Sequence, residues 1–76
     1  MTDRVLDLKG LKCPLPALKT RKALGPMTPG EIVAVWCTDP LSAIDIPNLV
    51  RETGDTLIEH QREDQALIFR IRREAR

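Results

Sequence analysis

Cys13 is the residue of this 76-residue chain best placed for chemistry, because it stands in the tetrapeptide Cys13-Pro14-Leu15-Pro16. The tetrapeptide follows a short apolar segment closed by Gly10 and precedes a stretch typical of a helix. Proline is favoured at the first helical position, so Pro14 predicts that Cys13 is the N-cap residue, with its sulfur near unpaired N–H groups. The helix dipole stabilises a thiolate there, and the sequence therefore predicts a lowered thiol pKa and a nucleophilic sulfur.

The basic residues around Cys13 favour the same prediction. Lys12 directly precedes the cysteine, and positive charge stabilises a thiolate. The other basic residues nearby in the sequence are Lys9, Lys19, Arg21 and Lys22. The alternative interpretation is a half-buried cysteine in front of an ordinary helix whose basic side chains are simply solvated.

Cys37 and His60 are the remaining candidates for a reactive site. Cys37 ends an apolar stretch, and we expect it to pack in the core, although a position near Cys13 would also allow it to act as a second thiol. His60 is the only histidine, and we expect an exposed strand residue rather than a catalytic base. A metal site would need a further ligand and lacks any Cys-x-x-Cys spacing, so the sequence predicts neither a metal nor a cofactor.

Turn residues divide the chain into six predicted elements. The pattern predicts strands over residues 4–8, 31–38, 56–62 and 66–72 and helices over residues 14–24 and 40–53. Asp39 is the expected cap of the second helix, and Gly54 ends it. Pro47 lies inside that helix and predicts a kink or a restart near Ile46.

The resulting order, βαβαββ, predicts an α/β (α+β) two-layer sandwich. Strands joined through a helix can lie parallel, whereas the last two form an antiparallel hairpin, so the four-stranded sheet should be mixed. Both helices should cover one face. In the last strand, Leu67, Phe69 and Ile71 should face the helices, and the alternate residue Ile68 should face away.

Length and composition limit the possible functions. Residues 1–76 fit one domain without room for a large substrate pocket, which favours a carrier or binding module over a self-sufficient enzyme. The net charge of +1 argues against nucleic acid as the main partner. The N-terminus lacks the apolar stretch of a signal peptide and no apolar run could span a bilayer, so we expect a cytoplasmic protein with reduced thiols and no membrane attachment.

A set of short motifs resembles the TusA/SirA-like sulfur-carrier family. The motifs are Leu6-Asp7, Gly10-Leu11-Lys12-Cys13-Pro14-Leu15-Pro16, Pro29-Gly30-Glu31, Asp39-Pro40 and Asp45-Ile46-Pro47. They cover nearly the whole chain, and their combination at these intervals is much more specific than Cys-Pro-x-Pro alone. The resemblance implies a βαβαββ sandwich and a carrier that holds sulfane sulfur as a persulfide on Cys13.

The resemblance also implies partners. The sulfur would come from a cysteine desulfurase or a rhodanese-like protein and would pass to an acceptor protein by thiol exchange. Members of the family supply tRNA 2-thiouridine formation, molybdenum-cofactor synthesis or sulfur oxidation. Pro14 and Pro16 would hold the turn rigid with the sulfur outward, and Lys12 would support the thiolate.

The pathway and two other functions stay open at the level of sequence. Cys37-Thr38 before the Asp-Pro pair and Leu41 after it depart from the common family pattern and alter the rim that a partner would contact. A thiol-disulfide protein using Cys13 and Cys37 would form a reversible intramolecular disulfide. A non-catalytic module could bind RNA through the basic last strand, but a single Trp and a single Phe offer few platforms for base stacking.

Overall fold

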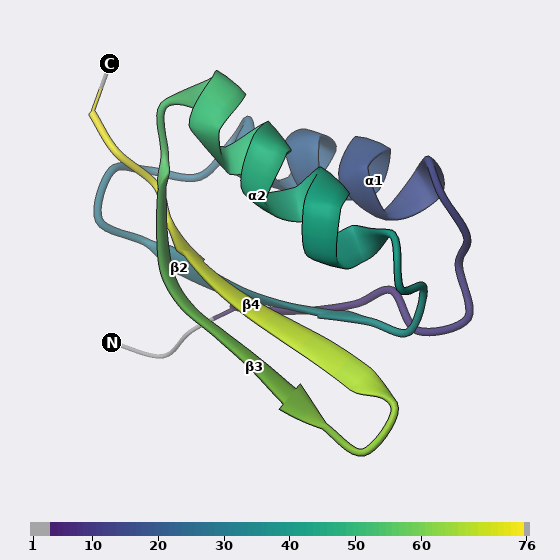
Figure 1. Ribbon diagram of the computed structural model, residues 1–76. Helices are drawn as coiled ribbons and strands as arrows, with labels where there is room; N and C mark the ends of the chain where they lie inside the picture. The colour runs from purple at the N-terminus through teal and green to yellow at the C-terminus, as the bar shows by residue number, and fades with distance from the viewer. Residues whose placement is uncertain (1–3, 76) are drawn as a thin grey trace.

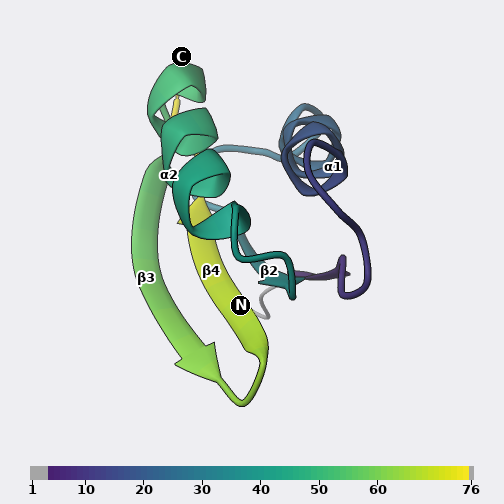
Figure 2. The same cartoon turned by 45° about the vertical axis from the view of Figure 1, so that its right-hand side comes forward.

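The computed structural model describes residues 4–75 of the chain. In chain order its elements are β1 (Arg4–Asp7), α1 (Leu15–Leu24), β2 (Ile32–Cys37), α2 (Ser42–Thr53), β3 (Thr56–Glu63) and β4 (Ala66–Arg72). Both helices lie on the same face of a single four-stranded sheet, as the two views in Figures 1 and 2 show. The predicted two-layer sandwich with a mixed sheet is confirmed.

The strands follow the order β1-β2-β4-β3, with β1 parallel to β2 and β4 antiparallel to both of its neighbours. The last strand of the chain is therefore a central one, and its apolar stretch from Ala66 to Phe69 is buried throughout. β3 is mostly exposed and forms an edge, where polar side chains hinder pairing with other chains. Ile68 lies opposite Trp36 and Gln61, and it is buried although it alternates with the core-facing residues.

The hydrophobic core lies between the sheet and the helices. Its strand residues include Val33, Val35, Leu67, Phe69 and Ile71, and its helix residues are Leu24, Ile46 and Val50. The prediction that Leu67, Phe69 and Ile71 are core residues is confirmed, since none is more than 5% exposed. In α1 the buried hydroxyl of Thr20 donates to the Pro16 carbonyl at 2.7 Å, which satisfies the only polar group of that helix face within the core.

α1 begins one residue later than the sequence predicts. The Pro14 carbonyl accepts the first helical hydrogen bond, from the Leu18 N–H at 3.1 Å, so Pro14 is the N-cap residue and the assignment of Cys13 to that place is wrong. The Leu15 N–H instead donates to the Lys12 carbonyl at 2.9 Å. This bond closes a turn in front of the helix, with a cis Cys13–Pro14 peptide bond, and Cys13 belongs to the turn.

α2 begins at Ser42 rather than at residue 40 and has Leu41 as its N-cap residue. Asp39 caps the turn that leads into the helix, because its Oδ1 accepts the Leu41 N–H at 2.9 Å. The helix continues through Pro47 without a restart, so that part of the prediction is wrong. A proline removes only one helical hydrogen bond, and the buried side chains of Ile46, Leu49 and Val50 pack the helix against the core. Gly54 ends α2 with a φ of 81°, as predicted.

The sheet register predicts unequal effects of the same substitution on two strands. Val35 is fully buried, whereas Val5 is 69% exposed. Val35→Ala should reduce the free energy of unfolding by about 2–3 kcal/mol, through two lost methyl groups and the cavity they leave. Val5→Ala should cost under roughly 1 kcal/mol. Urea denaturation of both variants measures the difference, and equal losses would contradict the register of β1 and β2.

Candidate functional site

Cys13 is an exposed free thiol in the turn between β1 and α1. Its backbone N–H donates to Oδ2 of Asp39 at 2.5 Å. The other oxygen of the same carboxylate, Oδ1, accepts a hydrogen bond from the Leu41 N–H at 2.9 Å. These two backbone hydrogen bonds keep the pKa of Asp39 below its ordinary value. A single carboxylate therefore connects the turn that carries the thiol to the beginning of α2.

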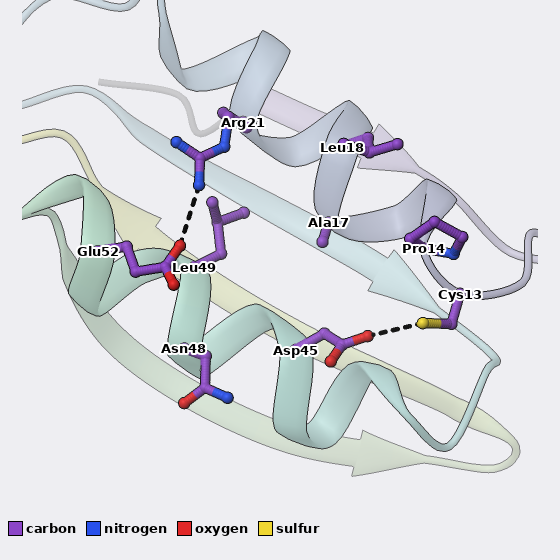
Figure 3. A pocket seen from close by; sticks show the side chains of 9 residues that line it. All are labelled: Cys13, Pro14, Ala17, Leu18, Arg21, Asp45, Asn48, Leu49 and Glu52. Carbon is purple, nitrogen blue, oxygen red and sulfur yellow. Dashed lines mark hydrogen bonds and ion pairs between the residues drawn. The ribbon is translucent and has the colours of Figure 1, made fainter.

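The thiol itself faces α2, as Figure 3 shows. Cys13 Sγ donates a hydrogen bond to Oδ2 of Asp45 at 3.0 Å. This hydrogen bond, then partial desolvation and the charges of Asp45 and Asp39, raise the pKa of the Cys13 thiol. The predicted lowering of the Cys13 pKa is wrong, because the sulfur lies beside carboxylates rather than at a helix cap.

The support of a Cys13 thiolate by Lys12 stays a prediction, and the charge of Lys12 has a resolved effect on a neighbouring carboxyl group. This charge acts on Asp39, where it contributes to the lowered pKa of that carboxyl group. Pro14 lines a groove beside the thiol, whereas Pro16 is a buried residue of the first turn of α1. The two prolines of the motif thus lie in different surroundings, since Pro14 is exposed and Pro16 is buried.

An open groove of about 380 Å³ runs between α1 and α2, with Cys13 and Asp45 at one end. At the other end Arg21 Nη2 and Glu52 Oε1 form an ion pair at 3.0 Å (Figure 3). The residues that line the groove are Cys13, Pro14, Ala17, Leu18, Arg21, Asp45, Asn48, Leu49 and Glu52. Asp45 belongs to the Asp45-Ile46-Pro47 motif, but its contact with the thiol is not predictable from the sequence, because no local signal connects residues 32 positions apart.

Exposed apolar side chains lie on the first turn of α1, which follows Cys13, and at the beginning of α2, which carries Asp45. Leu15 and Leu18 lie on the first turn of α1, and Leu41 and Ile44 lie at the beginning of α2, each between 44% and 60% exposed. Several large apolar side chains exposed together are typical of a surface that contacts another protein. The thiol is thus presented at an open surface and not inside an enclosed pocket.

Cys37 and His60 are not among the residues that line the groove. Cys37 is fully buried in the core, where burial raises its thiol pKa, so the expectation that it packs is confirmed. His60 is an exposed residue of β3 whose ring stacks on Phe69 with 4.5 Å between ring centroids, as expected of a strand residue. Among residues 4–75, no group of three or more His, Cys, Asp or Glu side chains is arranged to hold a metal ion.

Comparison with known proteins assigns the family. A family model described as Sulfurtransferase TusA matches residues 4–73. The chain belongs to the TusA family. Its TusA-family relatives include the sulfur carrier protein TusA of Allochromatium vinosum, to which it is 38% identical over 71 residues that cover 93% of each chain. A putative sulfur carrier protein of Thermotoga maritima is 41% identical over 56 residues, which cover 74% of this chain and 71% of the relative.

A solved structure supports the same fold. The crystal structure of a SirA-like protein from Desulfitobacterium hafniense matches with a TM-score of 0.80 over 93% of this chain and 97% of the other. At 20% sequence identity it supports the TusA-family fold alone. Within residues 4–75, neither helix of this TusA-family chain has the length and apolar character needed to cross a membrane.

The different burial of the two thiols predicts selective alkylation. Iodoacetamide should modify Cys13 in the folded protein and should reach Cys37 only after denaturant is added, because Cys37 is fully buried. Peptide mass spectrometry of samples alkylated with and without urea identifies the modified residue. Comparable modification of Cys37 in the folded protein would contradict its place in the core.

Proposed function

We propose that this protein is a sulfur carrier that holds sulfane sulfur as a persulfide on Cys13. The observation that carries the proposal is the contrast between the two thiols: Cys13 is exposed at the end of an open groove, and Cys37 is inside the core. Membership of the TusA family supports the same role, since relatives are named sulfur carrier proteins.

Loading is a thiol exchange without net oxidation. The Cys13 thiol loses its proton to solvent, and the thiolate attacks the outer sulfur of a donor persulfide. A new S–S bond forms on Cys13, the S–S bond of the donor breaks, and the donor leaves as a thiolate that takes up a proton. Delivery repeats the step in the other direction, with an acceptor thiolate attacking the outer sulfur and Cys13 leaving.

The donor that fits this chemistry is a cysteine desulfurase or a rhodanese-like protein, and the acceptor is another protein with a reactive thiol. The open groove and the exposed apolar side chains of α1 and of the beginning of α2 suit a sulfur atom delivered on a protein better than a free small molecule. The consuming pathway would be tRNA thiolation, molybdenum-cofactor synthesis or sulfur metabolism. We further propose that residues 1–76 act as one carrier domain in the cytoplasm, where thiols stay reduced.

The alternative of a thiol-disulfide protein has less support. It needs Cys37 to attack a sulfur on Cys13, and a fully buried thiol can do so only after the core opens locally. A raised pKa also makes Cys37 a poor thiolate at neutral pH. The single exposed thiol fits a carrier, which needs no internal partner.

Sulfur uptake should occur at Cys13 alone. After incubation with a cysteine desulfurase and cysteine, the intact mass should increase by about 32 Da per sulfur atom, and reductant should reverse the increase. Cys13→Ser should lose the uptake completely, because hydroxyl oxygen forms no persulfide, and Cys37→Ala should retain it. Wild-type yield in Cys13→Ser would exclude the proposed carrier residue.

A further inference from the structure

The resting geometry holds the Cys13 sulfur in a form that is unsuited to attack. A thiolate is the nucleophile in sulfur exchange, yet the Cys13 thiol donates its proton to Asp45 at 3.0 Å. A second carboxylate, that of Asp39, is bonded to the backbone of the same residue. Both negative charges oppose ionisation of the thiol. A working carrier therefore needs something that removes this opposition when a partner is present.

Within the proposed carrier function, we propose that Asp45 is a latch on Cys13, which keeps the resting thiol protonated until a partner protein brings a lysine or arginine side chain to the Asp45 carboxylate. The cation would pair with Asp45, withdraw the hydrogen-bond acceptor and compensate the negative charge. The thiol proton then passes to solvent through the open groove, and the thiolate forms only in the complex.

The latch is part of the fold rather than a chance surface contact. Asp45 lies in the first turn of α2, and its own N–H donates to the Leu41 carbonyl at 2.9 Å. The next residue, Ile46, is fully buried and fixes this turn on the core. On the other side, Asp39 fixes the Cys13 backbone. Thiol and carboxylate are thus each held in place by a separate backbone interaction.

Among residues 4–75, the charged side chains around the site do not include a cation that is paired with Asp45. The compensating cation therefore has to come from another molecule. Within residues 4–75 these charged side chains are Lys12, Asp39 and Asp45 at the thiol end and Arg21 and Glu52 at the far end. Lys12 acts on Asp39, and Arg21 is paired with Glu52 at 3.0 Å. No cationic side chain in the described part of the chain forms an ion pair with Asp45. A lysine or arginine of the partner is the chemistry that complements it.

The same carboxylates would favour release of the cargo. A persulfide is a stronger acid than a thiol, so the loaded side chain is an anion where the resting one is neutral. Repulsion from Asp45 and Asp39 would then turn the outer sulfur away from α2 toward solvent, where an acceptor thiol can reach it.

Alkylation kinetics at Cys13 test the latch. Asp45→Asn removes the charge at nearly constant shape, Asp45→Glu retains the charge, and Asp7→Asn is a matched control that makes the same substitution on β1. The rate of iodoacetamide alkylation, followed over a pH series by peptide mass spectrometry, reports the thiolate fraction. Asp45→Asn should move the midpoint of the pH profile of alkylation to lower pH. The alkylation rate at neutral pH should increase roughly three- to tenfold. Asp45→Glu and Asp7→Asn should stay within about twofold of wild type.

Charged thiol reagents imitate the partner's cation. Trimethylammonium-ethyl and sulfonatoethyl methanethiosulfonate differ in charge and share one reactive group. Wild type should prefer the cationic reagent, and Asp45→Asn should reduce that preference about threefold or more relative to Asp7→Asn. An Asp45→Asn variant with an unchanged midpoint and unchanged preference overturns the latch. Asp45→Ala gives the same readout if the asparagine variant unfolds.

Sulfur uptake measured in parallel separates the two proposals. Uptake of about 32 Da by wild type together with the alkylation changes in Asp45→Asn supports both. Uptake by wild type with no alkylation change in Asp45→Asn overturns the latch and leaves the carrier. Alkylation changes without any sulfur uptake by wild type support the control of the thiol by Asp45 and overturn the carrier function.

Discussion

The parallel pairing of β1 with β2 is the constraint on which the site depends. It brings the carboxyl ends of both strands to one edge of the sheet, so that the turn after β1 and the turn after β2 become neighbours. Thr38 and Asp39 follow β2 and bond to the backbone N–H groups of Gly10 and Cys13, which follow β1. The position of the Cys13 sulfur is therefore a consequence of the sheet topology.

Patterns between neighbouring residues predict the helices and strands of this chain well, but they predict the pKa of the Cys13 thiol poorly. The glycine ends, the alternation of apolar residues and the proline-initiated helix are signals carried by neighbours in the sequence, and they led to the correct sandwich. The ionisation of Cys13 is decided by Asp45, which is 32 positions away. The lysines close to Cys13 in the sequence therefore predict a lowered thiol pKa, whereas the structure raises it. The helix also starts one residue later than predicted, so Cys13 is not its N-cap residue.

The strand order shows a similar limit. The hairpin of β3 and β4 was predictable from its pattern, but the choice of β4 as the inner strand depends on which member of the pair can be buried on both faces. Ala66-Leu67-Ile68-Phe69 is continuously apolar, whereas β3 is polar or charged at every position from Glu59 to Glu63. That difference is visible in the sequence, and it explains why Ile68 is buried on the side away from the helices.

If Cys13 carries a persulfide as proposed, the burial of Cys37 has a consequence for the stability of that persulfide. A persulfide has two sulfur atoms, and a second thiol of the same chain that reached the inner one would form an intramolecular disulfide and expel the outer one as sulfide. Because Cys37 is enclosed in the core, this loss is prevented by packing alone. The same arrangement means that a Cys13 oxidised to sulfenic acid finds no resolving cysteine in its own chain and must be restored by an external thiol.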